Sequence, residues 1–163
     1  MSPGRSLGWL IAAGRLNPGP DSQVKQEPSA LGSLRVHQKL VEIRWNDVDA
    51  YRHVNNAVYL TYLEECRDEW LDRALGDAEN SWDFVIARVA IDFRRELRLE
   101  DDAVVVSCRL ARIGTSSVTT REEIRTAADE VAAEAEAVLV ARDPATGESR
   151  PLQPDERSAL ERA

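Results

Sequence analysis

The chain has 163 residues, enough for one domain with a substantial core. Its net charge of −8 predicts repulsion from a phosphate backbone, so we expect no nucleic acid partner. No apolar run approaches the length of a membrane span, so we expect no insertion into a membrane either.

Residues 1–33 hold four of the seven prolines and five of the eight glycines, without helical or strand periodicity. Such a composition is typical of disorder, so we expect a disordered N-terminal arm followed by a domain at residues 34–163. The apolar stretch at residues 7–13 is short and contains a glycine, which does not favour a secretory signal.

The first predicted elements are a strand and a long helix. Val41, Ile43 and Trp45 alternate with polar residues, which predicts a half-buried strand. Apolar residues then recur at helical spacing from Tyr59 to about residue 74, and Gly76 stands where the helix would end. The opposite face of this helix is polar and includes several acidic residues.

Four further strands are predicted from alternating apolar residues, at residues 85–93, 104–110, 118–124 and 131–142. Alanines and glutamates in the last segment favour a helix, but its alternation and its Val-Leu-Val run favour a strand. A short helix is expected at residues 154–162. Short connections predict an antiparallel sheet with the long helix laid across one face, an α+β fold.

The two cysteines, Cys66 and Cys108, show no spacing typical of a zinc site or a disulfide framework. Each lies on the apolar face of its predicted helix or strand, where a thiol behaves as a small buried hydrophobe. Two unpaired thiols are typical of a reducing compartment, so we expect the chain in the cytoplasm.

Polar residues crowd the junction between the first strand and the long helix, where residues 47–59 read DVDAYRHVNNAVY. The first turn of a helix has unpaired backbone N–H groups and a positive dipole end, which together can hold an oxyanion. Asp47 and Asp49 supply carboxylates a few residues before that turn. The junction is therefore the candidate site.

Residues 47–59, with the Leu63-Glu64-Glu65 continuation, resemble the signature of the hotdog-fold acyl-CoA thioesterases of the 4-hydroxybenzoyl-CoA thioesterase-like family. The resemblance covers residues 36–163. It implies a hotdog fold, in which a curved five-stranded antiparallel sheet wraps around a long central helix. Many relatives have glycine before the histidine, where this chain has Arg52.

The resemblance implies that Asp49 is the catalytic carboxylate and that the backbone amide of Asn56 polarises the thioester carbonyl. Thioester hydrolysis needs an attacking oxygen, either the carboxylate itself or a water that it deprotonates, and donors for the oxyanion. The candidate substrate-binding residues are His53, Asn55, Tyr59, Arg112, Thr115 and Ser116.

Structural roles compete with several of these assignments. Asp49 and Asn55 could each cap the loop or helix, and Asp47 is better explained by a hydrogen bond within the loop. His53 is as well explained by a structural role as by substrate orientation. Tyr59 lies on the apolar face of the predicted helix and is better explained by a place in the core.

Glutamate and arginine positions outside residues 47–59 offer weaker candidates: two acids on the predicted helix and a basic cluster after the predicted strand at 85–93. Glu64 and Glu65 offer helix-borne acids, but their position on the charged face favours solvation. Arg94, Arg95 and Arg98 form a second basic cluster, for which an exposed strand end is an equally good explanation.

The expected substrate is an acyl-CoA, with no cofactor, no metal and a homodimeric or homotetrameric assembly, because an uncovered edge strand favours pairing. The alternatives are a hydratase or dehydratase on the same fold and a non-catalytic acyl-CoA-binding protein. A metal site from Asp47, Asp49 and His53 lacks a further obvious ligand. The sequence leaves the acyl group open, and acyl carrier protein remains an alternative to coenzyme A.

Overall fold

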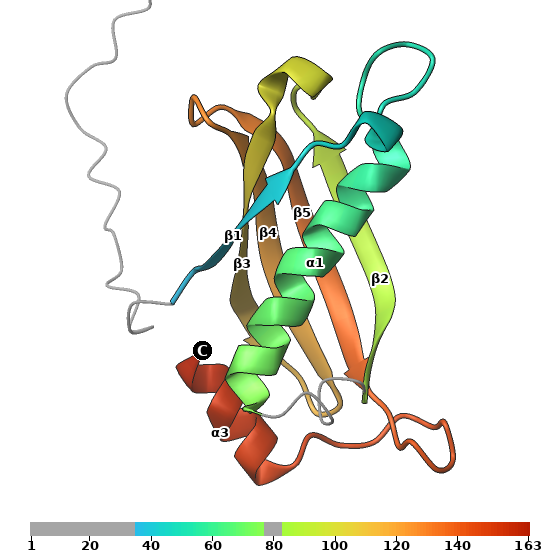
Figure 1. Cartoon of the computed structure of the whole chain (residues 1–163). Coiled ribbons are helices and arrows are strands. Elements are labelled where there is room, and N and C mark those ends of the chain that lie inside the picture. The colour runs from blue at the N-terminus through green and yellow to red at the C-terminus, as the bar shows by residue number, and fades with distance from the viewer. Residues whose placement is uncertain (1–34, 77–82) are drawn as a thin grey trace, which may run out of the picture. The chain divides into compact units, whose positions relative to one another are not determined.

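A computed structural model describes residues 35–76 and 83–163. Five antiparallel strands form one sheet in the order β1-β3-β4-β5-β2, and α1 runs obliquely across one face (Figure 1). In chain order the elements are β1 (His37–Glu42), η1 (Trp45–Asp47), α1 (Asn56–Leu75), β2 (Phe84–Phe93), η2 (Leu99–Asp101), β3 (Ala103–Ile113), β4 (Ser117–Thr126), β5 (Val131–Ala141) and α3 (Pro154–Arg162).

This architecture confirms the predicted α+β fold, including the alanine-rich last strand and the closing helix. The arm expected at residues 1–33 lies outside the described residues. Within the described ranges, no helix is long and apolar enough to cross a membrane.

The prediction that Trp45 belongs to the first strand was wrong. The strand ends at Glu42, and Trp45 begins a 3₁₀ turn with 79% of its surface exposed. The cause lies in Asp47, whose backbone N–H donates to the Arg44 carbonyl at 2.9 Å and whose carboxylate accepts from the Arg44 N–H at 2.8 Å. These local bonds compete with strand pairing and turn the chain toward α1.

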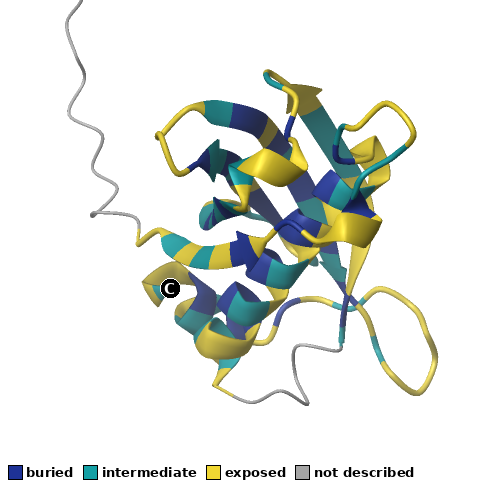
Figure 2. Ribbon diagram, turned by 45° about the horizontal axis from the view of Figure 1, so that its top comes forward, coloured by how far each residue is buried: buried dark blue, intermediate teal, exposed yellow. Residues whose placement is uncertain are grey.

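The apolar face of α1 supplies one half of the core, as its periodicity predicted. Tyr62, Leu63, Cys66 and Trp70 are each at most 2% exposed and belong to the hydrophobic core. Figure 2 colours the buried parts of the helices and strands dark blue. Both cysteines are buried and free. Fully burying a large apolar side chain contributes roughly 1.5–3 kcal/mol, so this face holds the helix on the sheet.

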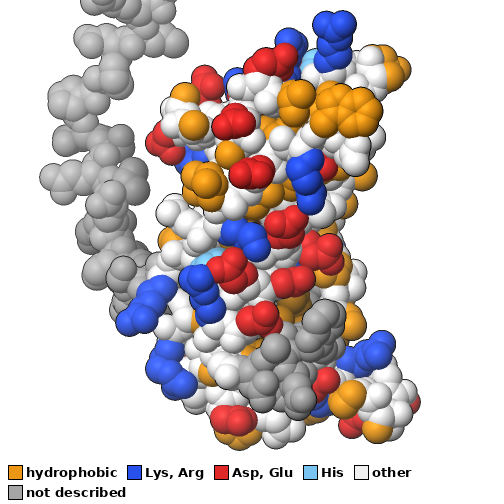
Figure 3. Space-filling model, viewed as in Figure 1, with side chains coloured by type: hydrophobic (Ala, Val, Ile, Leu, Met, Phe, Trp, Pro, Cys, Tyr) orange, Lys and Arg blue, Asp and Glu red, His pale blue; other side chains and the backbone are white. Residues whose placement is uncertain are grey.

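The polar face of α1 is also as predicted. Figure 3 shows Asp and Glu side chains gathering along the helix. Glu64 is exposed, and Glu65 is half-buried with Lys39 and Arg44 each 3.9 Å away. These contacts support the solvated-face interpretation of both glutamates.

A buried ion pair between α1 and β4 was not predicted. Arg67 Nη1 donates to both carboxylate oxygens of Glu122, at 3.1 and 2.9 Å, and the two side chains are 4% and 0% exposed. The Thr120 hydroxyl donates to Glu122 Oε1 at 2.6 Å. Burial raises the pKa of Glu122, while Arg67 and the Thr120 hydroxyl act to lower it.

Asp47 forms a second buried polar contact, which fastens the loop to α1. Its Oδ2 accepts from the Tyr62 hydroxyl at 2.7 Å and from Arg44 Nε at 3.2 Å. Burial acts to raise the pKa of Asp47, but the hydrogen bonds from Tyr62 and Arg44 hold it below its ordinary value. The structural role expected for Asp47 is confirmed.

We expect Arg67→Met to destabilise the fold by about 3–5 kcal/mol, because it leaves the buried Glu122 carboxylate without its cation. The double variant Arg67→Met with Glu122→Leu should recover most of that loss, since neither charge remains to be desolvated. Urea denaturation measures both free energies of unfolding. Equal losses in the single and double variants would contradict this account.

We expect Asp47→Asn to cost about 1.5–3 kcal/mol of stability at neutral pH, because charge-assisted hydrogen bonds are lost. A carboxyl with a lowered folded-state pKa stabilises the fold above its unfolded pKa of about 3.9, and this contribution disappears as pH falls through the folded value. The gap between wild type and variant should therefore close below about pH 4. Denaturation across pH measures this, and the exposed Glu148→Gln change is the matched control.

Candidate active site

The loop between η1 and α1 closes on itself around Asp49. The backbone N–H of Asp49 donates to the His53 carbonyl at 2.9 Å. Its Oδ1 accepts from the backbone N–H of Tyr51 at 2.8 Å and lies 3.4 Å from that of His53. Among the described residues Oδ2 has no hydrogen-bond donor. Asp49 therefore caps the loop with one oxygen and keeps the other available.

Arg52 adopts a left-handed backbone conformation within this loop, with a φ of 65°. That conformation costs a non-glycine residue about 1–2 kcal/mol and costs glycine almost nothing. The turn geometry thus explains why glycine suits this position in the relatives that the motif resembles. In this chain the same turn carries an exposed guanidinium instead.

The start of α1 provides an unpaired backbone donor. The Asn55 side chain accepts from the Ala57 N–H at 2.9 Å, which confirms Asn55 as the N-cap. For the backbone N–H of Asn56, the described part of the chain offers no acceptor. With the positive end of the helix dipole behind it, this amide can stabilise an oxyanion.

A cavity of about 250 Å³ opens beside this amide. Three of the predicted site residues line it, namely His53, Asn56 and Tyr59. Asp49 and Asn55 do not form its wall. The remaining lining residues are Val54, Phe93, Arg94, Arg95 and Glu96.

Tyr59 belongs both to the core and to the cavity wall. It is 2% exposed, and its ring packs edge-on against Phe93 with 5.1 Å between centroids. Its hydroxyl accepts from the Leu97 N–H at 2.9 Å and lies 3.3 Å from the Arg95 carbonyl. Burial raises the pKa of Tyr59, while the Leu97 N–H acts to lower it. The core role expected for Tyr59 is confirmed.

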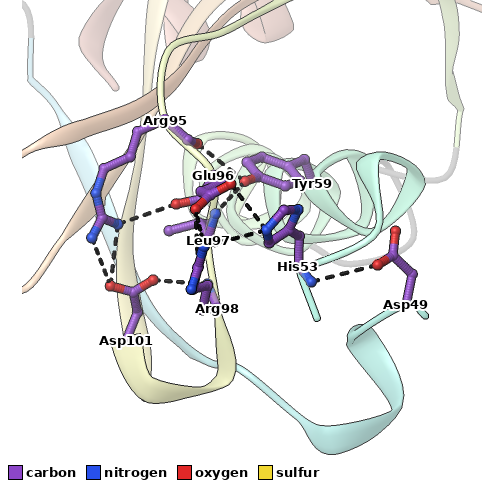
Figure 4. Close-up of polar contacts among 8 residues, drawn as sticks. All are labelled: Asp49, His53, Tyr59, Arg95, Glu96, Leu97, Arg98 and Asp101. Atoms are coloured by element: carbon purple, nitrogen blue, oxygen red, sulfur yellow. Dashed lines mark hydrogen bonds and ion pairs between the residues drawn. The ribbon is translucent and has the colours of Figure 1, made fainter. Parts of the chain in front are cut away.

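The segment after β2 forms the opposite wall, which the sequence did not predict as part of the site. Figure 4 shows Glu96 next to His53, backbone groups of Arg95 and Leu97 next to the Tyr59 hydroxyl, and the Arg95 guanidinium turned toward Asp101. The Leu97 carbonyl accepts from the Val54 N–H at 2.8 Å, and Glu96 Oε2 lies 3.0 Å from His53 Nε2. The only sequence signal was the cluster of arginines in this segment.

Those arginines are engaged with neighbouring carboxylates. Arg94 Nε donates to Glu134 at 2.8 Å, and Arg95 donates to Asp101 at 3.1 Å. Arg98 Nε donates to Glu96 at 2.9 Å. The cluster therefore orders this segment through ion pairs and does not form a field of unpaired cations.

Arg112, Thr115 and Ser116 lie at the other end of the sheet. The backbone carbonyls of Thr115 and Ser116 accept from Leu152 and Ala141, both at 2.9 Å. The length of β3, about 35 Å at roughly 3.3 Å per residue, separates this hairpin from the cavity wall. A single protomer does not bring these residues to the cavity.

Asp47, Asp49 and His53 do not converge on a common point. Asp47 faces Tyr62, Asp49 faces its own loop, and His53 faces Glu96. Within residues 35–76 and 83–163, no three His, Cys, Asp or Glu side chains are placed to hold a metal ion.

Comparison with known proteins gives several relatives. Over 127 residues the chain is 28% identical to the long-chain acyl-CoA thioesterase FadM of Escherichia coli, covering 76% of this chain and 96% of FadM. A Thermus thermophilus thioesterase, solved with coenzyme A and zinc, is 32% identical, with a TM-score of 0.71 and coverage of 77% of this chain and 92% of that one.

A predicted thioesterase from Bacillus stearothermophilus is 26% identical, with a TM-score of 0.72 and coverage of 78% and 96% of the two chains. These neighbours confirm the expected hotdog fold. The family model of the thioesterase-like superfamily matches residues 43–160, which include the Asp49 loop, α1 and strands β2 to β5. The chain therefore belongs to the thioesterase-like superfamily, as the resemblance of residues 47–59 predicted.

Proposed function

We propose that this protein hydrolyses acyl-CoA thioesters to a free acid and coenzyme A at the cavity beside α1. The observation that carries the proposal is the unpaired Asn56 amide at the start of α1, on the wall of a cavity that adjoins the Asp49 loop. An oxyanion donor at the cavity, with a carboxylate in the adjoining loop, supplies the two groups that acyl transfer requires. The relatives named for acyl-CoA hydrolysis or bound to coenzyme A support this substrate class.

In the proposed reaction Asp49 provides the attacking oxygen, either directly or by taking a proton from water. Its free Oδ2 is the atom available for this step, because Oδ1 is held by the Tyr51 amide. The carbonyl oxygen becomes an oxyanion that the Asn56 N–H stabilises, and the tetrahedral intermediate collapses to release the coenzyme A thiolate. If water attacks, the free acid forms at once and the proton that Asp49 took passes to the thiolate. If Asp49 attacks, the acyl group remains on it as a mixed anhydride, which water then hydrolyses to the free acid, regenerating Asp49 and supplying the thiolate with its proton. The two buried, unbridged cysteines support the cytoplasm as the compartment.

One observation favours a second candidate, a hydratase or dehydratase. Such sites need a histidine paired with an acid, and His53 has Glu96 at 3.0 Å. Incubation with a 2-enoyl-CoA separates the two, because hydration removes the enoyl absorbance without releasing a thiol. Thioester hydrolysis releases the thiol, so a thiol reagent detects it directly.

We further propose a homodimer formed through the outer edge of β2. This edge has no partner strand within the described sheet, and its large apolar residues Val85, Ile86 and Phe93 are 38–45% exposed. A long, apolar, unpaired edge favours pairing with a second copy. Two-fold symmetry would make that pairing antiparallel.

Antiparallel pairing would reunite the two halves of the predicted site. Phe93, at one end of β2, lines the cavity. Phe84, at the other end, is paired with Ala141, whose N–H donates to the carbonyl of Ser116 in the distant hairpin. When two β2 strands run in opposite directions, the hairpin end of one protomer lies beside the cavity end of the other. The partner could then supply contacts to the nucleotide of coenzyme A.

We expect Asp49→Asn to lower kcat by about 10²–10⁴-fold, as loss of a positioned base does. Asparagine accepts the same loop hydrogen bond, so Tm and acyl-CoA binding should stay near wild type. Thiol release across short, medium, long and aromatic acyl-CoAs gives kcat and KM. If the variant keeps most of its activity, Asp49 only caps the loop.

Mixed dimers test the shared site. Arg112→Glu combined with Thr115→Asp should raise KM about tenfold or more, because like charges repel the coenzyme A phosphates. Co-refolding this variant with Asp49→Asn should restore about a quarter of the wild-type sites at low substrate, because half the dimers are mixed and each has one intact site. The separately refolded variants, mixed afterwards, are the control. No recovery would mean that Asp49 and the two hairpin residues serve the site of the same protomer, or that the hairpin residues serve no site.

A further inference from the structure

The Glu96 carboxylate bridges two side chains at the wall of the cavity (Figure 4). Its Oε2 lies 3.0 Å from His53 Nε2, and its Oε1 accepts from Arg98 Nε at 2.9 Å. Each carboxylate oxygen therefore has its own partner. Arg98 is fixed in turn by its backbone N–H, which donates to Asp101 at 2.8 Å.

The His53 ring is held between Glu96 and Arg98. Its Nε2 lies 3.0 Å from Glu96 Oε2 and 3.5 Å from Arg98 Nη2, and Arg98 is itself bound to the other oxygen of Glu96. The three side chains therefore form one contact group at the wall of the cavity.

The backbone of His53 is tied to Asp49. The His53 carbonyl accepts from the Asp49 N–H at 2.9 Å, and the His53 N–H lies 3.4 Å from Asp49 Oδ1. The next residue, Val54, donates its N–H to the Leu97 carbonyl at 2.8 Å. Neighbouring residues of the Asp49 loop thus contact neighbouring residues of the 95–98 segment, once through the backbone and once through His53 and Glu96.

We propose that Glu96 is a positioning residue that holds the His53 ring against the 95–98 segment and thereby sets the orientation of the Asp49 loop at the cavity. The inference rests on the proposed thioester hydrolysis at this site. Within the described residues Glu96 contacts neither Asp49 nor the Asn56 amide, so it acts on the Asp49 loop through His53, while its other partner, Arg98, belongs to its own segment. Its removal should lower the rate more than it weakens acyl-CoA binding.

The size of the effect follows from exposure. The His53 and Glu96 side chains are 36% and 48% exposed, and solvent weakens an ion pair of this kind. Loss of such a weak contact can displace the Asp49 loop without unfolding the protein. We therefore expect Glu96→Ala to lower kcat about three- to tenfold with little change in KM or Tm.

The matched control is Glu100→Ala. Glu100 is an exposed glutamate in η2, four residues from Glu96, and has no ion pair within the described ranges. It should keep wild-type kcat. The conservative Glu96→Gln should keep most of the activity, because its amide oxygen can still accept from Arg98 Nε and its side chain can still contact the His53 ring. A merely electrostatic role of Glu96 would instead give Gln and Ala variants of equal activity.

A double-mutant cycle tests whether Glu96 acts through His53. In the His53→Asn background, Glu96→Ala should cause no further loss of kcat, because the contact is already gone. Additive losses, or a Glu96→Ala variant as active as wild type, would overturn the proposal.

Hydrogen exchange gives a readout that does not depend on turnover. Peptides covering residues 47–55 should exchange faster in Glu96→Ala and remain unchanged in Glu100→Ala. A wild-type protein without thiol release on any acyl-CoA would sink the proposed function, while the exchange result would still test the Glu96 contact. Unchanged exchange in an active protein would overturn the contact alone.

Discussion

The hydroxyl of Tyr59 joins α1 to the segment that follows β2, and the cavity depends on that junction. It accepts from the Leu97 N–H and faces the Arg95 carbonyl, so one atom serves two backbone groups that leave the sheet. Without this hydroxyl, the buried N–H of Leu97 would have no hydrogen-bond partner within the described residues. Tyr59 thus sets the distance between the two walls of the cavity, one from the Asp49 loop and one from β2.

The sequence predicted what depends on local periodicity and local polarity. The amphipathic α1, the alternating strands, the Asn55 cap and the crowded loop are all readable from short windows. Trp45 was misassigned because a side-chain bond from Asp47 displaced the strand period. Arg67 with Glu122 and His53 with Glu96 could not be predicted, because 55 and 43 residues separate the partners. Only the packing of α1 and the neighbouring loops on the sheet brings such pairs together.

The candidate site shows the same division between residues that are close in sequence and residues that are far apart. His53, Asn56 and Tyr59 meet in one protomer because they belong to one loop and the first turn of one helix. Arg112, Thr115 and Ser116 stand at the far end of β3, where sequence proximity gives no hint of distance from α1. The candidate substrate-binding residues named from the sequence include both groups, whereas the fold of one chain separates them. A second copy paired along β2 is the simplest way to join them.

The buried pair of Arg67 and Glu122 also restricts how β4 can align with its neighbours. Side chains of β4 alternate between the two faces, so a slip of one residue would exchange them. In one direction Arg121 would replace Glu122 beneath α1, and in the other Arg125 would replace Ile124. Either slip would bury an arginine, and the first would place it against Arg67. The alternation of β4 therefore excludes the misaligned sheets nearest to the native one, in the strand that lies at the centre of the sheet.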